Sequence, residues 1–489
     1  MFPYDELFGF SLSGAFSFMK WLGIAWLVYI ICLSIWIILQ KRAPVSTLSW
    51  ILALAFIPYG GFIIYHFFGP QKLKRQQFRR LLSRTALKEH SDYLQLRNHI
   101  LAASTHSQEL MQLANMIRTT TGFPLTTAKS LKLLVDGTET FTAILDAIAH
   151  ATHHIHLEYY IFDPDRIGTR LRDLLIQKAK EGVKVRLLVD GIGSSRLKNA
   201  FIQPLLRAGA RFAFFHKPHI TQLIKPLVNL RTHRKIVICD GLVGFTGGLN
   251  ITDQEDERVY EYAYHDTHLQ LTGNAVHWLQ LIFMEDWLYA SGEKEIPDLA
   301  NYFPIQSSGP YPVQVIPSGP DNEWEIIHRI YLSMIQRARK RIWLTTPYFV
   351  PTEATLFALT SAALRGVDVR LLVPRMSDSR LVTSAARSYF DELMRAGVRI
   401  WEYHGRMLHS KTIVVDHHYS LIGTANFDSR SFRLNFEVCI AAYGPRLAEL
   451  LSDQFECDLV CAERVPFNRH IGLIQKMFEA TARLFSPLL

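Results

Sequence analysis

The feature that most constrains the fold is a short pattern, His-x-Lys-x-x-x-x-Asp, that occurs twice in the chain. Its residues are His233, Lys235 and Asp240 in the first copy, and His409, Lys411 and Asp416 in the second. In both copies a glycine follows the histidine by 14 residues and an asparagine follows it by 17, namely Gly247 and Asn250, then Gly423 and Asn426. This repetition indicates an internal duplication, in which each half supplies part of one shared site.

Other segments repeat as well. Residues 182–189 match residues 366–373, Arg207-Ala208-Gly209 matches Arg395-Ala396-Gly397, and residues 155–164 correspond to residues 342–351. These apolar, β-branched runs alternate with helical patterns such as Leu171 to Lys180 and Leu356 to Leu364. Alternating strands and helices predict α/β sheets with helices packed on them. We therefore expect two homologous α/β domains, residues 123–305 and 306–489, related by pseudo-twofold symmetry.

The spacing between equivalent positions is 188 residues at Arg-Ala-Gly but 176 at the motif histidine, so the first half carries twelve extra residues. The insertion lies within Phe214 to Leu230, which is apolar with flanking lysines. Two interpretations stay open for this loop: it dips into a membrane surface, or it covers the domain.

Composition and charge limit the class of protein. The chain has 489 residues, 49% hydrophobic and 20% charged, which fits a globular enzyme with a membrane segment. A formal net charge of +9 favours an anionic partner, either nucleic acid or an acidic membrane surface. Five cysteines without a Cys-x-x-Cys pair support neither a disulfide framework nor a zinc site. Cys457 and Cys461, one helical turn apart, are expected to be buried thiols.

The N-terminal region predicts a transmembrane helical hairpin over residues 1–70. Trp21 to Leu39 carries no charge, and Leu48 to Phe68 is similarly apolar. Each approaches the ~20 residues that a helix needs to cross a bilayer. The first stretch is too long for a cleaved signal peptide and lacks a small-residue cleavage site.

Residues 71–122 are predicted to form a basic helical linker. Five positive charges begin it, Lys72, Lys74, Arg75, Arg79 and Arg80. Their excess over the hairpin loop, which carries only Lys41 and Arg42, predicts that the large C-terminal part lies in the cytoplasm. The basic cluster either holds anionic headgroups or is a solvated helix face.

The C-terminal segment from Ile471 to Phe485 predicts an amphipathic helix, with Ile474, Met477 and Phe478 among its apolar residues. Docking on the protein is favoured over an orientation in lipid.

The residue types and spacing of the duplicated motif suit chemistry at a phosphate group. The runs from His233 to Ile238 and from His409 to Val415 predict strands, on which residues two apart point the same way. Each motif thus directs an imidazole and an ammonium at one spot. Two such faces give a local charge of at least +2, which suits a phosphate. One histidine can attack phosphorus while the other, protonated, serves the leaving oxygen.

The remaining candidate residues support this pair. Lysines stabilise charge on the phosphoryl oxygens, so neither a metal nor another cofactor is expected. Asp240 and Asp416 complete the candidate catalytic motifs but fall where the strands end, which favours structural or charge-balancing roles. The amides of Asn250 and Asn426 can bind the phosphate. Glu437 in the second half and Asp266 in the first are the candidates for orienting the histidines.

At this point the residues resemble the phospholipase D superfamily, which is named for the same motif and built from two such halves. Within it, the chain is similar to bacterial cardiolipin synthases, and this resemblance implies a multi-pass protein of the bacterial inner membrane with its catalytic domains in the cytoplasm. The similarity lies in the hairpin, with Trp50, Pro58, Gly60, Gly61 and residues 65–69, and in residues 346–351, 423–431, 435–437 and 485–489.

The resemblance implies transfer of a phosphatidyl group from one phosphatidylglycerol to another, with release of glycerol and a phosphohistidine intermediate. It implies that His233 is the nucleophile and His409 the acid/base, although the duplication makes the roles nearly interchangeable. The first copy has Gly248 where the second has Thr424.

Alternatives remain within and outside this class. A phospholipase D or another phosphatidyltransferase would differ only in the acceptor, which the motif does not specify. A phosphodiesterase nuclease would use the same site, but it needs no membrane anchor, so we expect a lipid substrate and no nucleic acid. A non-catalytic membrane scaffold is disfavoured because both motifs are complete. The oligomeric state stays open.

Overall fold

The computed structural model describes residues 12–39, 44–57, 108–216 and 230–489, and these belong to two compact units. The first unit contains helices α1 (Leu12–Ile38) and α2 (Pro44–Phe56). Ile37 and Leu54 are buried where the two helices contact one another. Within the described ranges, no helix combines the length and the hydropathy that a membrane crossing requires. The transmembrane hairpin stays a prediction, and residues 58–68 of its second stretch lie outside the described part.

The second unit contains both copies of the motif and is built around two sheets. The seven-stranded sheet has the order β2-β8-β7-β6-β3-β4-β5. Its strands are β2 (Ser130–Val135), β3 (His154–Tyr159), β4 (Lys184–Asp190), β5 (Arg211–Phe215), β6 (Ile236–Cys239), β7 (Val243–Gly247) and β8 (Thr267–Thr272). Strands β3, β4 and β5 are parallel, and the others pair antiparallel.

The nine-stranded sheet has the order β1-β9-β17-β15-β14-β10-β12-β13-β18. Its strands are β1 (Thr126–Ala128), β9 (Tyr311–Ser318), β10 (Arg341–Thr345), β12 (Asp368–Pro374), β13 (Arg399–Tyr403), β14 (Thr412–Val415), β15 (Tyr419–Gly423), β17 (Glu437–Tyr443) and β18 (Ala462–Arg464). A separate two-stranded sheet joins β11 (Phe349–Val350) to β16 (Phe427–Asp428). Without β1 and β18, the nine-stranded sheet repeats the order of the seven-stranded one, position by position.

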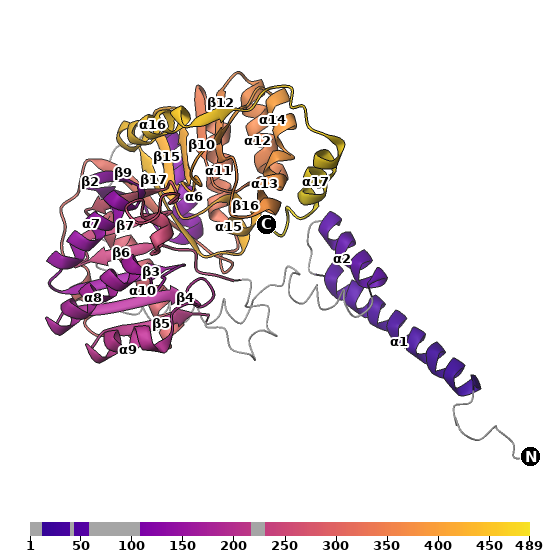
Figure 1. Cartoon of the computed structure of the whole chain (residues 1–489). Helices are drawn as coiled ribbons and strands as arrows, with labels where there is room; N and C mark the ends of the chain where they lie inside the picture. Colours follow the sequence, from indigo (N-terminus) through magenta and orange to yellow (C-terminus); the bar gives the residue numbers. More distant parts are fainter. Residues whose placement is uncertain (1–11, 40–43, 58–107, 217–229) are drawn as a thin grey trace, which may run out of the picture. The chain divides into compact units, whose positions relative to one another are not determined.

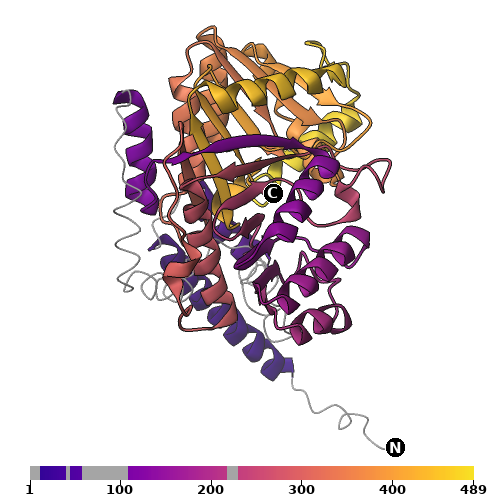
Figure 2. The ribbon, with the colours of Figure 1, turned by 90° about the vertical axis from the view of Figure 1, so that its left-hand side faces the viewer.

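One strand crosses the domain boundary expected from the sequence. β1 lies in the range assigned to the first domain, yet it pairs with β9 at the edge of the second half's sheet. The two halves also form a single compact unit. In Figures 1 and 2 the first half, purple to magenta, lies directly against the second half, orange to yellow.

Helices cover both faces of each sheet. The helices of the first half are α7 (Asp136–His150), α8 (Arg166–Lys180), α9 (Asn199–Arg207) and α10 (Ala275–Ser291). A 3-10 turn lies on either side of α10 in the chain, η2 (Asp253–Glu255) before it and η3 (Leu299–Tyr302) after it. Alternation along β3 decides which layer each side chain joins: Ile155 and Leu157 join the core with α7 and α8, while His154 and His156 contact Gln280 of α10.

The second half repeats this layering. Its helices are α11 (Ile326–Arg337), α12 (Glu353–Leu364), α13 (Arg380–Arg387), α14 (Phe390–Arg395), α15 (Ser429–Arg433), α16 (Pro445–Val460) and α17 (Leu473–Leu484). On β10, Ile342 and Leu344 pack with α11 and α12, whereas Trp343 stacks on Phe455 of α16. Helix α6 (Gln108–Thr121) packs on α11 through Leu113 and Ile117. Each half is thus a three-layer α/β/α arrangement.

The structure refines two expectations about the C-terminal region. Cys457 and Cys461 are exposed, so the prediction of buried thiols is wrong. Helix α17 docks through Ala482, which is buried with Val350 and Ala385, while Ile474, Met477 and Phe478 are exposed. The apolar face of this helix therefore does not supply the contact with the protein. The insertion at residues 214–230 lies mostly outside the described residues.

Arg234 links the two halves beside the duplicated motif. It is buried, ion-paired to Asp286 of α10, and donates to the carbonyl oxygens of Ser318 and Glu437 at 3.1 Å each. Asp286 belongs to a helix of the first half, and both carbonyl oxygens belong to strands of the nine-stranded sheet, so one guanidinium connects the first half to the second. A planar group with five donors suits such a junction, and a lysine could not reach all three acceptors.

We expect Arg234→Met to lower the free energy of unfolding by about 3–5 kcal/mol, because it removes the partner of a buried carboxylate. Chemical denaturation of the purified protein measures this loss. The double variant Arg234→Met/Asp286→Leu should recover part of it, since the charge is removed together with its partner. A double variant less stable than the single one would contradict this account.

His265 forms a second connection between the halves. Its Nδ1 lies 2.8 Å from Asp136 Oδ1 in the first half, and its Nε2 lies 2.7 Å from Asp458 Oδ1 on α16. Burial alone would lower the pKa of His265, but hydrogen bonds and charge from Asp136 and Asp458 outweigh it and raise the pKa to about 10. The ring is therefore a buried cation between two carboxylates.

This ion triad should stabilise the fold most strongly below neutral pH. The pKa of His265 in the folded protein lies above that of an unfolded histidine, about 6.5. Its contribution is complete below pH 6.5 and is lost as the pH rises toward 10. We expect His265→Gln to cost about 3 kcal/mol at pH 6, with the difference from the parent shrinking by pH 10. Denaturation curves at both pH values check this, and a constant difference would refute it.

Candidate active site

The motif residues lie just before the strands on which the sequence placed them. β6 begins at Ile236 and β14 at Thr412, so His233, Lys235, His409 and Lys411 precede them. The reason is that these segments pair with the other half instead of with a neighbouring strand of their own sheet. Thr232 forms a parallel bridge with Phe436, and Leu408 forms one with His265.

The backbone of each motif histidine is held by the opposite half. His233 N donates to Phe436 O at 2.8 Å, and His409 N donates to His265 O at 2.7 Å. The two contacts are equivalent under the pseudo-twofold relation, because Leu408 and His265 occupy the places of Thr232 and Phe436. The chain thereby sets both histidines at the boundary between the halves.

The orienting carboxylates cross between the halves as well. His233 Nδ1 lies 3.0 Å from Glu437 Oε2, and His409 Nδ1 lies 2.7 Å from Asp266 Oδ2. Both carboxylates follow directly after the bridging residues Phe436 and His265, so they are symmetry equivalents. Each fixes a proton on Nδ1 and leaves Nε2 of the ring for chemistry.

The surroundings of the two carboxylates differ in one respect that the sequence had flagged. Thr424 Oγ1 donates to Glu437 Oε2 at 2.5 Å. In the first half Gly248 stands in place of Thr424, and a Cβ added there would lie 2.1 Å from Asp266 Oδ1. The glycine therefore makes room for Asp266, and the departure between the two copies reflects packing around the orienting carboxylate.

The lysines share the same buried space. Lys235 Nζ donates to His233 O at 2.9 Å, Lys411 Nζ donates to His409 O, and Lys411 Nζ lies 3.8 Å from Asp266 Oδ2. Burial lowers the pKa of Lys235 to about 7, and it also lowers the pKa of Lys411. A bound phosphate would reverse this effect by supplying negative charge.

Electrostatics indicate that the two motifs face one site. Burial is the main cause of the lowered pKa of His233, and Lys411 of the other motif lowers it further. In the same way burial lowers the pKa of His409 to about 4, with a contribution from Lys235. Each lysine thus acts on the histidine of the opposite half, which requires that the four side chains lie near one another.

The charge of the site is lower than the motif alone suggests. Burial by itself would raise the pKa of Glu437 and of Asp266, but the neighbouring histidines and lysines outweigh it and lower both. Two ionised carboxylates therefore offset the two lysines. The expected local charge of at least +2 counted the two lysines but not these two carboxylates. Their presence follows from the burial of the lysines, because cations are buried only with nearby counter-charges.

The asparagines and the motif aspartates occupy different places. Asn250 Nδ2 donates to Glu255 Oε1 at 3.3 Å, and Asn426 Oδ1 is buried with no hydrogen-bond partner among the described residues. Asp240 instead accepts from the amides of residues 152–154, and Asp416 accepts from those of residues 339–341. Both aspartates sit in turns with positive φ beyond the far ends of β6 and β14, so they hold the loops there and do not reach the histidines.

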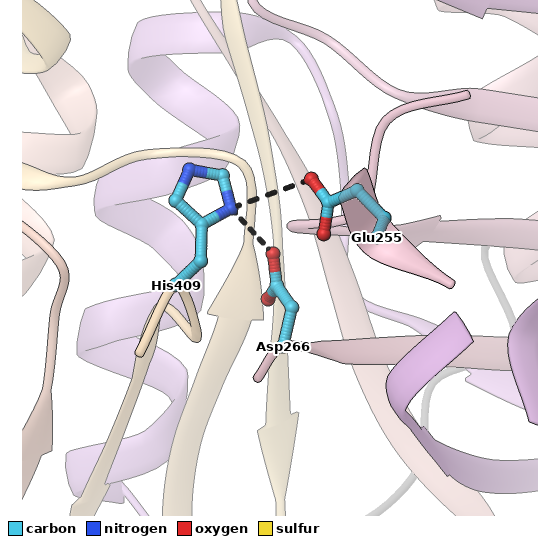
Figure 3. A group of neighbouring side chains, drawn as sticks. All are labelled: Glu255, Asp266 and His409. Atoms are coloured by element: carbon cyan, nitrogen blue, oxygen red, sulfur yellow. Dashed lines mark hydrogen bonds and ion pairs between the residues drawn. The ribbon is translucent and has the colours of Figure 1, made fainter. Parts of the chain in front are cut away.

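Two neighbouring groups of the site were not anticipated from the sequence. Tyr160 contacts His233 with a centroid separation of 5.1 Å, and it follows directly after β3. Glu255 is fully buried, with Oε1 at 3.8 Å from His409 Nδ1 (Figure 3). Comparison of the halves could not find Glu255, because the equivalent position of the second half is Ser431.

Glu255, Asp266 and His409 place donor atoms within 4.8 Å of one another. Such a cluster has the residue types of a metal site, but His409 Nδ1 is already engaged by Asp266, and the ammonium of Lys411 supplies positive charge at the same carboxylate. The arrangement fits proton and phosphoryl chemistry.

Comparison with known proteins agrees with this geometry. A model of the family described as "Cardiolipin synthase, PLD-like domain" matches residues 144–287 and 331–459, one match in each half. A second model, "Phospholipase_D-nuclease N-terminal", matches residues 27–70. Among solved structures, a phosphatidylserine synthase of Haemophilus influenzae superposes with a TM-score of 0.59 at 16% identity, covering 77% of this chain and all of that one. This last similarity concerns the fold alone.

Curated relatives extend over nearly the whole chain. A cardiolipin synthase of Halalkalibacterium halodurans is 42% identical and covers 94% of this chain and 92% of its own. A cardiolipin synthase of Alkalihalophilus pseudofirmus is 40% identical and covers 96% and 94%, respectively. With matched domains in both halves and two histidines held by crossed carboxylates, the chain belongs to the cardiolipin synthase family of phospholipase D-like phosphatidyltransferases.

Proposed function

We propose that this protein forms cardiolipin from two molecules of phosphatidylglycerol and releases glycerol. The observation that carries the proposal is the pair of buried histidines, each with Nδ1 engaged by a carboxylate of the opposite half. Family membership makes the chain a phosphatidyltransferase, and the relatives named cardiolipin synthase support this choice of acceptor.

In the first step, His233 Nε2 attacks phosphorus, and the bond from phosphorus to the glycerol oxygen breaks. Glu437 supports this step because it accepts a hydrogen bond from Nδ1–H of His233 and stabilises the positive charge that develops on the ring. His409, protonated on Nε2, gives its proton to the departing oxygen. The products are glycerol and a phosphatidyl group bonded to His233.

In the second step the same two histidines act in the reverse sense. The hydroxyl of the second phosphatidylglycerol gives its proton to His409 Nε2 and attacks phosphorus. The bond from phosphorus to His233 breaks, and cardiolipin forms. Lys235, Lys411 and the amides of Asn250 and Asn426 stabilise the phosphoryl oxygens in both steps. Over the cycle His409 regains the proton that it gave up, and His233 is released from phosphorus, so the two steps need no cofactor.

We also propose that the protein acts at the bacterial inner membrane, anchored by residues 1–70 and with the motif-bearing halves in the cytoplasm. Exposed apolar side chains along α1, among them Trp21, Leu27 and Ile35, support a lipid environment for this helix. Recovery of the full chain with the membrane fraction, and its release by detergent but not by high salt, tests the anchor. Release by salt alone would reject it.

Product analysis tests the activity. The full chain, purified in detergent, is supplied with phosphatidylglycerol, and lipids and free glycerol are quantified together. We expect one glycerol for each cardiolipin. Phosphatidic acid as the main product would instead identify a phospholipase D that uses water, and the absence of lipid turnover would reject the proposal. The variant His233→Ala/His409→Ala serves as the blank.

A further inference from the structure

The two halves of the site also differ at the buried position of Glu255. Glu255 follows Asn250 by five residues, and Ser431 follows Asn426 by five. Asn250 N donates to Glu255 Oε1 at 3.3 Å, and Asn426 N donates to Ser431 Oγ at 3.2 Å. The same structural position therefore holds a carboxyl group in the first half and a hydroxyl group in the second.

This carboxyl lies beside one histidine of the pair. Oε1 of Glu255 is 3.8 Å from His409 Nδ1, which also donates to Asp266 (Figure 3). Its second oxygen, Oε2, is buried and has no hydrogen-bond partner among the described residues. On the opposite side His233 Nδ1 contacts Glu437 Oε2 at 3.0 Å. Among the described residues, His409 thus lies within 4 Å of two carboxyl groups and His233 of one.

Phosphatidyl transfer needs an unequal pair of rings. At the start one ring must be neutral to attack phosphorus, and the other must carry the proton for the leaving oxygen. A site with exact twofold symmetry gives no reason for the proton to reside on either ring. An additional acidic group beside one ring makes the two rings unequal, because that side of the site can then hold one more proton.

We propose that Glu255 is a positioning residue that retains the catalytic proton on the His409 side of the site, and this inference rests on the proposed function. Glu255 acts through His409 and Asn250, not on the substrate itself. Its two roles are to supply negative charge next to the protonated ring and to hold the amide of Asn250.

The proton affinities of the pair are consistent with this role. Burial and the charge of Asp266 raise the pKa of Glu255 to about 8, while burial lowers the pKa of His409 to about 4. As a pair they keep one proton until the pH passes about 8. When Glu255 is ionised, its charge favours the protonated form of His409. A lone His409 would lose its proton well below neutral pH.

Other charged and titratable groups face this pair or the lysines beside it, and they are common to the parent and to the variants below. They are Asp266, Lys411, Lys235, Glu437, His268, Tyr159 and Tyr264. Because these groups stay unchanged, a shift in the pH profile of a Glu255 variant reports on Glu255 itself.

The first experiment compares Glu255→Gln with Ser431→Ala over pH 5.5–9. Glutamine keeps an oxygen that accepts from Asn250 but cannot ionise, and Ser431→Ala alters the equivalent position without changing charge. We expect the ratio of parent rate to Glu255→Gln rate to rise at least about tenfold between pH 6 and pH 8, which is a shift of about one pH unit or more. The profile of Ser431→Ala should keep the parent's shape. A Glu255→Gln profile parallel to the parent's would overturn the proposal.

The second experiment moves the carboxyl to the other side with the double substitution Glu255→Ser/Ser431→Glu. Turnover is quenched in alkali, and the phosphatidyl-histidine is located by peptide mass spectrometry. The parent should carry the phosphatidyl group on His233, and the exchanged variant should carry it on His409. A phosphatidyl group that remains on His233 in a folded exchanged variant would contradict the inference. If that variant does not fold, the pH profile of Glu255→Gln decides.

These outcomes separate the inference from the function on which it rests. A parent enzyme that forms no cardiolipin from phosphatidylglycerol rejects the proposed function. An active parent whose pH profile is unaffected by Glu255→Gln rejects only the role of Glu255.

Discussion

His233→Ala and His409→Ala should each lower the rate of cardiolipin formation by about 10⁴-fold or more, because each removes a group that exchanges a bond or a proton with the substrate. The double variant should be little worse than either single one, since the histidines act as a unit. The rate of glycerol release from phosphatidylglycerol measures all three. More than a few per cent of parent activity in either single variant would count against a site shared by two histidines.

A substrate with a better leaving group distinguishes the two roles. When p-nitrophenol replaces the departing glycerol, the leaving oxygen needs no proton. His409→Ala should then release a burst of p-nitrophenol of about one equivalent, whereas His233→Ala should release none, since it lacks the attacking nitrogen. Circular dichroism controls for folding. A burst from His233→Ala and none from His409→Ala would exchange the proposed roles.

The crossed carboxylates give the second large effect. Glu437→Gln and Asp266→Asn should each lower kcat by about 10²–10⁴-fold, because the ring loses the acceptor that fixes its tautomer and stabilises its positive charge. Both substitutions keep the size of the side chain, which limits the structural cost. Steady-state rates at saturating phosphatidylglycerol measure the loss, and thermal unfolding checks that both variants remain folded.

The burst assay tests the crossing itself. Because Glu437 engages His233, Glu437→Gln should resemble His233→Ala and give a slow or absent burst. Because Asp266 engages His409, Asp266→Asn should resemble His409→Ala and keep the burst. Pairing within each half predicts the opposite pattern, so one measurement distinguishes the two arrangements.

Much of the fold could be predicted from local pattern. The runs that include Val185 and Val369 form equivalent strands, β4 and β12, because an apolar β-branched run between helices has few other stable placements. The partner of β1 could not be predicted in this way. Three residues, Thr126 to Ala128, carry no information about which of two sheet edges they will join. The sequence also placed residues 233–235 and 409–411 on strands, whereas β6 and β14 begin after them. This error has the same cause, because these segments pair with residues of the other half.

The site was predictable only where the duplication marked it. His233, Lys235, His409 and Lys411 stand out because they repeat. Glu437 and Asp266 could be named as acceptors, but no pattern relates Glu437 to a histidine 204 residues away, or Asp266 to one 143 residues away. Glu255 was not found, since its counterpart is a serine and comparison of the halves detects only what is alike.

The sequence by itself determined that two similar α/β halves would each bring an imidazole and an ammonium to a phosphate-binding site. Spacing along a strand is a local property, and the chain states it twice. Tertiary structure alone decided which carboxylate meets which ring and which side of the site carries an additional acid. Those contacts depend on how the halves dock, and docking is governed by buried surfaces and charges that lie far apart in the chain.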